Sequence, residues 1–190
     1  VTNTPEVLNA CVADLTMGLT ISVLRRIPHA DQFTRTQPWT GLTGDYAYPL
    51  TRSLKGKTMG IVGLGRIGME TAHRAQAFGM KIAYHNRSKR DDVAFAYHDT
   101  PAKLAAASDV LVLLCPGGAA TQHLVNREVL DALGPEGYLI SVSRGSVVDE
   151  PELIRALADG RIAGAAMDVY EREPQVPDAL KTMDNVVLAP

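Results

Sequence analysis

The sequence of 190 residues lacks the features that mark a membrane span, a signal peptide or a strongly charged binding surface. Its apolar runs, such as Val110–Cys115, are far shorter than the about 20 residues that cross a bilayer. The start has no basic stretch followed by an apolar one, so a cytosolic, cytoplasmic location is the expectation. A formal net charge of −2 gives no support to a nucleic-acid or anionic-membrane partner.

Cysteine is also scarce. Cys11 and Cys115 both lie among apolar residues, and neither shows the spacing of metal ligands. We therefore expect two buried thiols, with no disulfide and no metal site.

Apolar residues make up 46% of the chain, which suits one compact domain. Thr4-Pro5-Glu6 has the form of a helix start, and Arg25, Arg26 and Pro28 are typical of a helix end. Between them, apolar residues recur at helical spacing: Leu8, Val12, Leu15, Leu19 and Val23. The pattern predicts a long helix within residues 1–28 that precedes the rest of the fold. Residues 29–56 contain several prolines and glycines without periodicity, which predicts an irregular connection.

From Lys57 to the end, short apolar runs alternate with helical stretches. The expected strands lie near 59–62, 81–85, 109–114, 138–142, 163–167 and 186–188. The expected helices lie near 66–78, 101–107, 126–132 and 150–158. The run DVLVLLC is apolar at successive positions, as strands buried on both faces of a parallel sheet require. Residues 57–190 therefore predict an α/β fold of the Rossmann type, with a doubly wound parallel sheet.

A glycine-rich turn follows the first of these strands. Gly63-Leu64-Gly65-Arg66-Ile67-Gly68 has the GxGxxG pattern, with the strand MGIV before it and a helix after it. Gly63 would make the tight turn, Gly65 would let a pyrophosphate approach, and Gly68 would let helix and strand pack closely. The amides at the helix start, near Arg66 and Ile67, would hold the phosphates.

The second strand ends in YHNRSKR, without the acidic residue that accepts hydrogen bonds from the ribose of NAD. Arg87 can bind a 2′-phosphate through its guanidinium, while Asn86 and Ser88 can donate neutral hydrogen bonds. This pattern favours NADP(H). The alternative is a solvated basic loop formed by Arg87, Lys89 and Arg90.

The segment SVSRGSVVDEPELIRALADGRIAGAAMDVYEREP, residues 141–174, is more specific than the glycine turn. Together with VGLGRIG and NTPEVL, it closely resembles the D-isomer-specific 2-hydroxyacid dehydrogenases. The resemblance covers essentially all 190 residues and is greatest to the NADP-dependent glyoxylate/hydroxypyruvate reductases. It implies hydride transfer between NADPH and a small 2-oxo acid such as glyoxylate or hydroxypyruvate. It also implies a homodimer, built by the first helix and the connection after it, including Trp39.

The resemblance assigns roles to individual residues. Arg144 would bind the substrate carboxylate and carbonyl oxygen, and Glu173 would hydrogen-bond a catalytic histidine and raise its basicity. The alternatives are an ion pair of Arg144 with Asp149 or Glu150, and a purely surface role for Glu173. Asp168 corresponds to the aspartate near the nicotinamide carboxamide, and its alternative is a strand-end cap.

Further cofactor contacts are implied along two loops. Cys115, Pro116 and Thr121 would lie along the adenosine and ribose, at the carboxyl edge of the sheet. The backbone of Val142 and Ser143 would pass close to the nicotinamide.

The sequence departs from the family in two ways. The family places its histidine directly after an Ala-Pro pair, and the five histidines here are at other positions: His29, His73, His85, His98 and His123. The family's substrate domain is also absent from these residues. The expectation is therefore a nucleotide-binding domain of a larger enzyme, which binds NADP(H) but turns over 2-oxo acids poorly. The alternatives are an NAD-dependent phosphoglycerate-type or formate-type dehydrogenase, or a dinucleotide-sensing co-repressor of the same fold.

Overall fold

The computed structural model describes residues 8–190, and its centre is a seven-stranded, all-parallel sheet in the order β3-β2-β1-β4-β5-β6-β7. The strands are β1 Thr58–Val62, β2 Lys81–His85, β3 Ala96–Tyr97, β4 Val110–Leu113, β5 Tyr138–Ser141, β6 Gly164–Met167 and β7 Val186–Leu188. β4 alternates between the two cores, because Val110 and Val112 face one side of the sheet while Leu111 and Leu113 face the other. Both faces are therefore packed, as the continuous apolar runs predicted.

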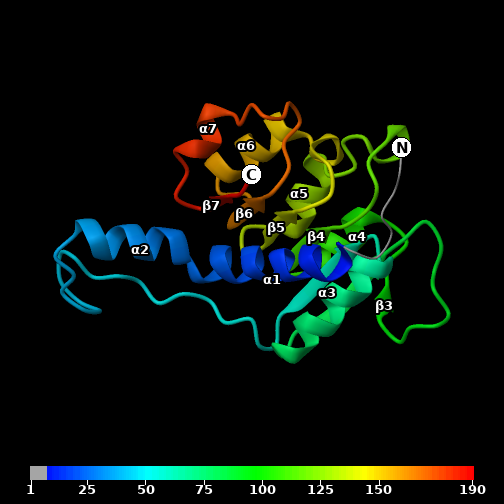
Figure 1. The fold of residues 1–190 in the computed structure, drawn as a ribbon, viewed down its shortest axis with the longest axis horizontal. Helices are drawn as coiled ribbons and strands as arrows, with labels where there is room; N and C mark the ends of the chain where they lie inside the picture. The colour runs from blue at the N-terminus through cyan, green and yellow to red at the C-terminus, as the bar shows by residue number, and fades with distance from the viewer. Residues whose placement is uncertain (1–7) are drawn as a thin grey trace.

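Helices cover both faces of this sheet (Figure 1). They are α1 Asn9–Arg25, α2 Ile27–Thr36, α3 Arg66–Ala77, α4 Pro101–Ala106, α5 Arg127–Leu133, α6 Glu150–Ala158 and α7 Asp178–Lys181. α1 and α3 pack together on one face, and α4, α5 and α6 form a layer on the other. The predicted doubly wound α/β fold is confirmed.

α1 is part of this domain and does not merely precede it. Ala13, Met17 and Leu24 on α1 are buried, and α1 contacts α3, β5, β6 and β7. Most of the apolar stripe that predicted this helix therefore packs on the sheet of the same chain. The predicted helix start at Thr4-Pro5-Glu6 lies outside the described residues.

The connection after α1 differs from the expectation of an irregular segment. Arg26 has a left-handed backbone, with φ of 51°, and ends α1. Pro28 lies in the first turn of α2, where its fixed φ suits a helix and its missing N–H needs no acceptor. The chain therefore restarts a helix before it becomes irregular at Gln37.

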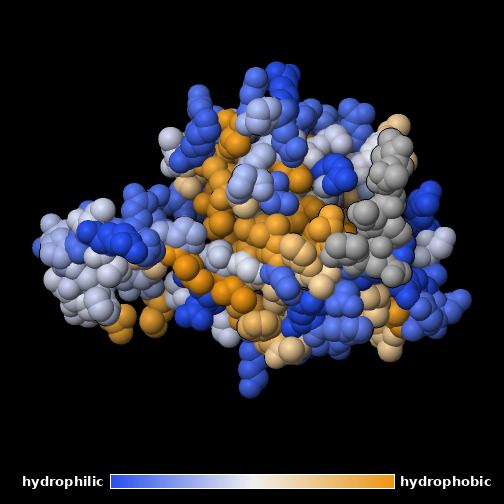
Figure 2. Space-filling model, in the orientation of Figure 1, coloured by the Kyte–Doolittle hydropathy of each residue, from blue (hydrophilic) through white to orange (hydrophobic). Residues whose placement is uncertain are grey.

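We call residues 27–53 the arm, because α2 and the segment after it extend away from the sheet (Figure 1). Its apolar side chains are strongly exposed: Leu50 is 86%, Leu42 67% and Trp39 60% exposed. Figure 2 shows further apolar surface over the centre of the same view, between α1 and β7.

The two cysteines differ in exposure. Cys11 is exposed on α1, which corrects the expectation of two buried thiols, while Cys115 is buried, and both are free.

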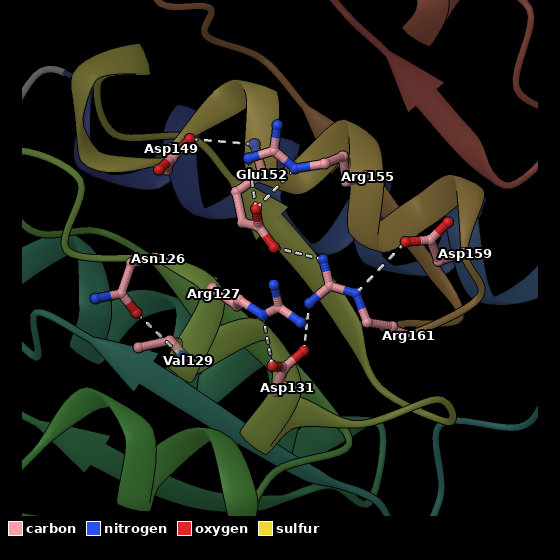
Figure 3. A network of polar contacts seen from close by, with 9 residues as sticks. All are labelled: Asn126, Arg127, Val129, Asp131, Asp149, Glu152, Arg155, Asp159 and Arg161. Atoms are coloured by element: carbon pink, nitrogen blue, oxygen red, sulfur yellow. Dashed lines mark hydrogen bonds and ion pairs between the residues drawn. The ribbon is translucent and has the colours of Figure 1, made fainter.

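Charged residues join the helices of the second layer (Figure 3). The buried Glu152 carboxylate accepts hydrogen bonds from Arg155, at 2.9 and 2.6 Å, and from Arg161. Arg161 also pairs with Asp131 on α5. The two arginines hold the pKa of Glu152 below its ordinary value, so the network links α5 to α6 through a carboxylate that stays charged.

In residues 8–190 we find no helix of the length and hydrophobicity needed to cross a membrane.

Candidate functional site

Two overlapping cavities lie at the carboxyl edge of the sheet, where the chain turns from β1 in one direction and from β4 in the other. The larger has a volume of about 1190 Å³ and the smaller about 700 Å³. Gly63, Gly65 and residues 114–118 line both of them. They therefore form one long groove across the point at which strand order reverses, which is where doubly wound sheets bind ligands.

The glycine turn forms the floor of this groove, and each glycine has a separate geometric reason. Gly63 has φ of +100°, and a Cβ there would lie 2.6 Å from the amide nitrogen of Cys115. A Cβ on Gly68 would lie 2.6 Å from the Gly63 carbonyl oxygen. A Cβ on Gly65 would meet nothing within 4 Å, although Gly65 lines both cavities. The turn is thus tightly packed behind and open in front.

The amino end of α3 opens into the groove. Its N-cap is Gly65, and no side chain caps it. The first amides of a helix have no acceptor within the helix, and they carry the positive end of its dipole. Arg66 and Ile67, in the first turn, also line the larger cavity. This geometry fits a phosphate or pyrophosphate without further change.

The smaller cavity contains the predicted residues at the end of β2. Arg87 and Ser88 are exposed there, and of its described lining residues none is aspartate or glutamate. The side-chain oxygen of Asn86 accepts a hydrogen bond from the Leu64 amide at 2.7 Å, so Asn86 holds the glycine turn.

Arg90, in the same loop, is bound to the domain itself. It pairs with Asp92 and donates to the Leu64 carbonyl at 2.9 Å. The YHNRSKR segment is therefore divided, because Arg90 supports the turn while Arg87 faces the cavity.

The loop after β4 forms the wall shared by both cavities. Cys115 is buried, which raises the pKa of its thiol, and Pro116 follows it along the groove. The Thr121 hydroxyl donates to the Pro116 carbonyl at 2.8 Å and so braces the loop. All three predicted loop residues thus line the groove: Cys115 and Pro116 line both cavities, and Thr121 lines the smaller one.

Arg144 and Glu173 both line the larger cavity, although 28 residues separate them in the chain. Gly145 explains how: a Cβ there would lie 1.9 Å from the Tyr170 carbonyl oxygen, so the two backbone segments touch. Arg144 is exposed and donates to the Ser143 carbonyl at 2.6 Å. The Glu173 carboxylate accepts from the Tyr170 amide at 3.0 Å. A guanidinium and a carboxylate therefore share one cavity wall.

The acidic neighbours proposed as alternative partners of Arg144 have other contacts. Asp149 accepts a hydrogen bond from the Glu152 amide at 3.1 Å and caps α6. The buried Glu150 accepts from the Glu171 amide at 3.3 Å. Among the described residues no ion pair joins Arg144 to either acid, which leaves its guanidinium available to an anion in the cavity.

Val142 and Ser143 are buried in the cavity wall beside Arg144, and the Ser143 hydroxyl has no hydrogen-bond partner among the described residues. Asp168 lies at the end of β6, half-buried, and is not among the described lining residues of either cavity. Burial and then the nearby Glu173 raise the pKa of Asp168. The structure thus places Asp168 close to the wall and outside the cavity lining.

Several lining residues were not predicted from the sequence. Asn9 and Val12 bring the first turn of α1 over the larger cavity, and Tyr170 and Arg172 line it from the segment that carries Glu173. The DVYEREP motif contains the last two and offered a signal for them, whereas no local pattern points to Asn9. Residues 8–190 contain no group of three or more His, Cys, Asp or Glu side chains that could hold a metal ion.

Comparison with known proteins gives a family match over nearly the whole chain. The model of the family "D-isomer specific 2-hydroxyacid dehydrogenase, NAD binding domain" matches residues 17–190. A hydroxyphenylpyruvate reductase of Plectranthus scutellarioides is 50% identical over 190 residues, covering 100% of this chain and 59% of the relative. A glyoxylate/hydroxypyruvate reductase of Arabidopsis thaliana is 49% identical with the same coverage. The chain therefore spans about three fifths of the length of these curated relatives.

Solved structures include proteins that are similar to this chain in both fold and sequence. The NADPH-dependent glyoxylate/hydroxypyruvate reductase of Sinorhizobium meliloti, solved in complex with NADP and malonate, superimposes with a TM-score of 0.93 at 50% identity. The match covers 100% of this chain and 59% of that one.

Proposed function

The chain belongs to the D-isomer-specific 2-hydroxyacid dehydrogenase family, and from this premise we propose that it binds NADP(H) for the reduction of a small 2-oxo acid. Glyoxylate and hydroxypyruvate are the substrates of this proposal. The observation that carries it is the groove. It contains the start of α3, which no side chain caps; at one end Arg87 lines it and no described lining residue is acidic, and at the other end Arg144 and Glu173 line it. The sequence relatives support the same class of substrate, since two of them are named as reductases of 2-oxo acids.

The residues of the groove fit a dinucleotide in one direction. The amides at the start of α3 would hold the pyrophosphate, because Gly65 leaves the approach open. The smaller cavity would take the adenosine half, and the larger cavity the nicotinamide half beside Val142 and Ser143. When bound, NADPH supplies the hydride of the proposed reaction.

The smaller cavity supports the proposed preference for NADP(H) over NAD(H). Arg87 and Ser88 face it, and its described lining residues include no carboxylate that would repel a 2′-phosphate. Because the Asn86 oxygen is bonded to the Leu64 amide, we assign most of the phosphate contact to Arg87. A guanidinium can grip a phosphate through two parallel hydrogen bonds.

At the other end, the Arg144 guanidinium would bind the carboxylate of the substrate. Glu173 would orient the histidine that protonates the substrate oxygen, by accepting its ring N–H. No histidine lies among the described residues that line the larger cavity. We therefore propose that the 190-residue chain binds the cofactor without substantial turnover, and measurable reductase activity of this chain would contradict that.

We also propose that the chain forms a homodimer, with the arm as the main contact. The apolar stripe of α1 packs largely on its own sheet, whereas Trp39, Leu42 and Leu50 on the arm are mostly exposed. Exposed apolar residues gathered on one segment mark a contact surface. Size-exclusion chromatography with light scattering tests this, and a monomer at micromolar concentration would contradict it.

The experiment that tests the cofactor assignment is a pair of fluorescence titrations, with NADPH and with NADH, on the parent chain and on Arg87→Ala. We expect Arg87→Ala to weaken NADPH binding about tenfold or more, because one or more hydrogen bonds to a charged phosphate are lost. NADH binding should hardly change. If the parent chain binds NADH as tightly as NADPH, the assignment of NADP(H) fails.

Lys89→Ala is the matched control. Lys89 is exposed in the same loop and carries the same charge, but it does not line the smaller cavity. We expect a much smaller loss of NADPH affinity than for Arg87→Ala. Equal losses would mean that the loop acts only through its overall charge.

A further inference from the structure

Gly117 lies against the side chain of Arg144. It belongs to the loop after β4 and lines both cavities. A Cβ on Gly117 would lie 2.8 Å from Cγ and 3.0 Å from Cβ of Arg144. These two atoms are at the base of the arginine side chain, so the clash cannot be relieved by moving only the flexible end of that side chain. The present direction of Arg144 therefore requires a glycine at position 117.

The neighbouring glycine has a different reason. Gly118 has φ of +139°, where L side chains are strained, and a Cβ there would meet nothing within 4 Å. Gly117 is not among the residues with a left-handed backbone. Position 118 thus needs glycine for backbone conformation, and position 117 needs it for space.

We propose that Gly117 is a positioning residue for Arg144, and that its missing side chain selects the rotamer that directs the guanidinium into the larger cavity. This rests on the proposed function, in which Arg144 binds the substrate carboxylate. The χ1 torsion of an arginine has three staggered positions, and a Cβ at residue 117 would exclude the one occupied here. Any other χ1 position moves every atom beyond Cβ, including the guanidinium.

The surroundings of Arg144 strengthen this argument. On the backbone side, Gly145 is pressed against the Tyr170 carbonyl, so the backbone at Arg144 cannot retreat from the loop. The guanidinium donates to the Ser143 carbonyl at 2.6 Å. Arg144 therefore lies between two glycines. Gly145 restricts its backbone, and Gly117 leaves the space that its Cβ and Cγ atoms occupy.

A double-mutant cycle in melting temperature tests the contact itself. We expect Gly117→Ala to lower the melting temperature by several degrees in the parent, and by at least about 2 °C less in the Arg144→Ala background, where Cγ is gone. Gly118→Ala is the matched control, and its loss should be the same in both backgrounds, because it arises from backbone strain. Equal losses for Gly117→Ala in the two backgrounds would overturn the proposal.

Titrations with oxalate, a planar dicarboxylate probe, test the consequence in the NADP-loaded chain. For folded Gly117→Ala we expect the dissociation constant of oxalate to rise about tenfold, as for the loss of a charge-assisted hydrogen bond. The dissociation constant of NADPH, whose proposed groove Gly117 also lines, should rise by a smaller factor than that of oxalate. A parent chain that binds no NADPH contradicts the proposed function and leaves the melting cycle to decide on Gly117. Unchanged oxalate affinity, or an equal loss for NADPH, overturns the positioning role.

Discussion

Replacing Gly145 with alanine should destabilise the domain through a clash between two backbone segments. The new Cβ would lie 1.9 Å from the oxygen and 2.0 Å from the carbon of the Tyr170 carbonyl, and 2.5 Å from the Glu171 amide nitrogen. Ordinary Cβ contacts begin at 3.4 Å, so the segments must separate by the difference of 3.4 and 1.9, which is 1.5 Å. Overpacking of this kind costs about 1–3 kcal/mol or more. For a domain of this size, that lowers the melting temperature by roughly 2–12 °C.

Thermal unfolding followed by circular dichroism measures this effect, and Gly18→Ala is its control. Gly18 is exposed in the interior of α1, and a Cβ there would meet nothing within 4 Å. The same chemical change should therefore stabilise the protein by about 0.5–1 kcal/mol, because alanine is the better helix former. The two substitutions are expected to shift the melting temperature in opposite directions.

A Gly145→Ala variant that melts at or above the temperature of the parent would refute this reasoning. It would mean that the segment carrying Glu173 yields at little cost, and that the closeness of Arg144 and Glu173 is not enforced by packing. A destabilised Gly18→Ala would instead show that melting temperatures in this chain do not follow local contacts.

Two further substitutions separate binding from stability. Asn86→Ala removes the acceptor of the Leu64 amide, so titrations should show NADPH and NADH both weakened by a similar factor of about five; a loss confined to NADPH would place Asn86 on the 2′-phosphate instead. For Asp109, partial burial raises the pKa of the carboxyl group. The hydrogen bonds that it accepts from the Thr58 amide, at the start of β1, and from the Lys57 ammonium outweigh burial and hold this pKa below its ordinary value. Because the pKa is lower in the folded state, the Asp109 carboxylate stabilises the protein at pH values above its unfolded-state pKa of about 3.9. This stabilisation is lost as pH falls through the folded-state pKa. Asp109→Asn should therefore flatten the acid end of a plot of melting temperature against pH, and an unchanged slope would contradict this.

The sequence predicted the sheet well because its strands are buried on both faces. β4 and β5 are apolar at nearly every position, and the helices between strands are long enough to show a repeat or are preceded by clear caps such as Asn126 and Asp149. Two elements were missed because they are very short: β3 Ala96–Tyr97 and α7 Asp178–Lys181. Neither offers enough residues for a period to be recognised.

α2 was missed for a different reason. A break at Arg25 and Arg26 was predicted, but a left-handed arginine followed at once by a new helix has no distinct sequence signal. Non-glycine residues with positive φ are uncommon, so the pattern favoured the end of helical structure at that point.

The site was predicted in its local motifs and missed in its long-range contacts. The spacing of Gly63, Gly65 and Gly68 is visible in the chain because one turn contains all three. The roles of Gly117 and Gly145 depend on residues 27 and 25 positions away in sequence, Arg144 and Tyr170, and no spacing reveals them. The hydrogen bond from the Leu64 amide to Asn86 is of the same kind.

The position of α1 bears on how the chain reaches its native state during synthesis. α1 packs against α3, which lies in the first half of the chain, and also against β6 and β7, which are translated much later. At about 5–20 residues per second, the interval between α1 and β7 lasts on the order of ten to thirty seconds. During that time the part of α1 that faces β6 and β7 stays uncovered beside the ribosome. α1 therefore completes its packing only after β7 has been translated, and until then its uncovered part is open to chaperones and to premature association with other chains.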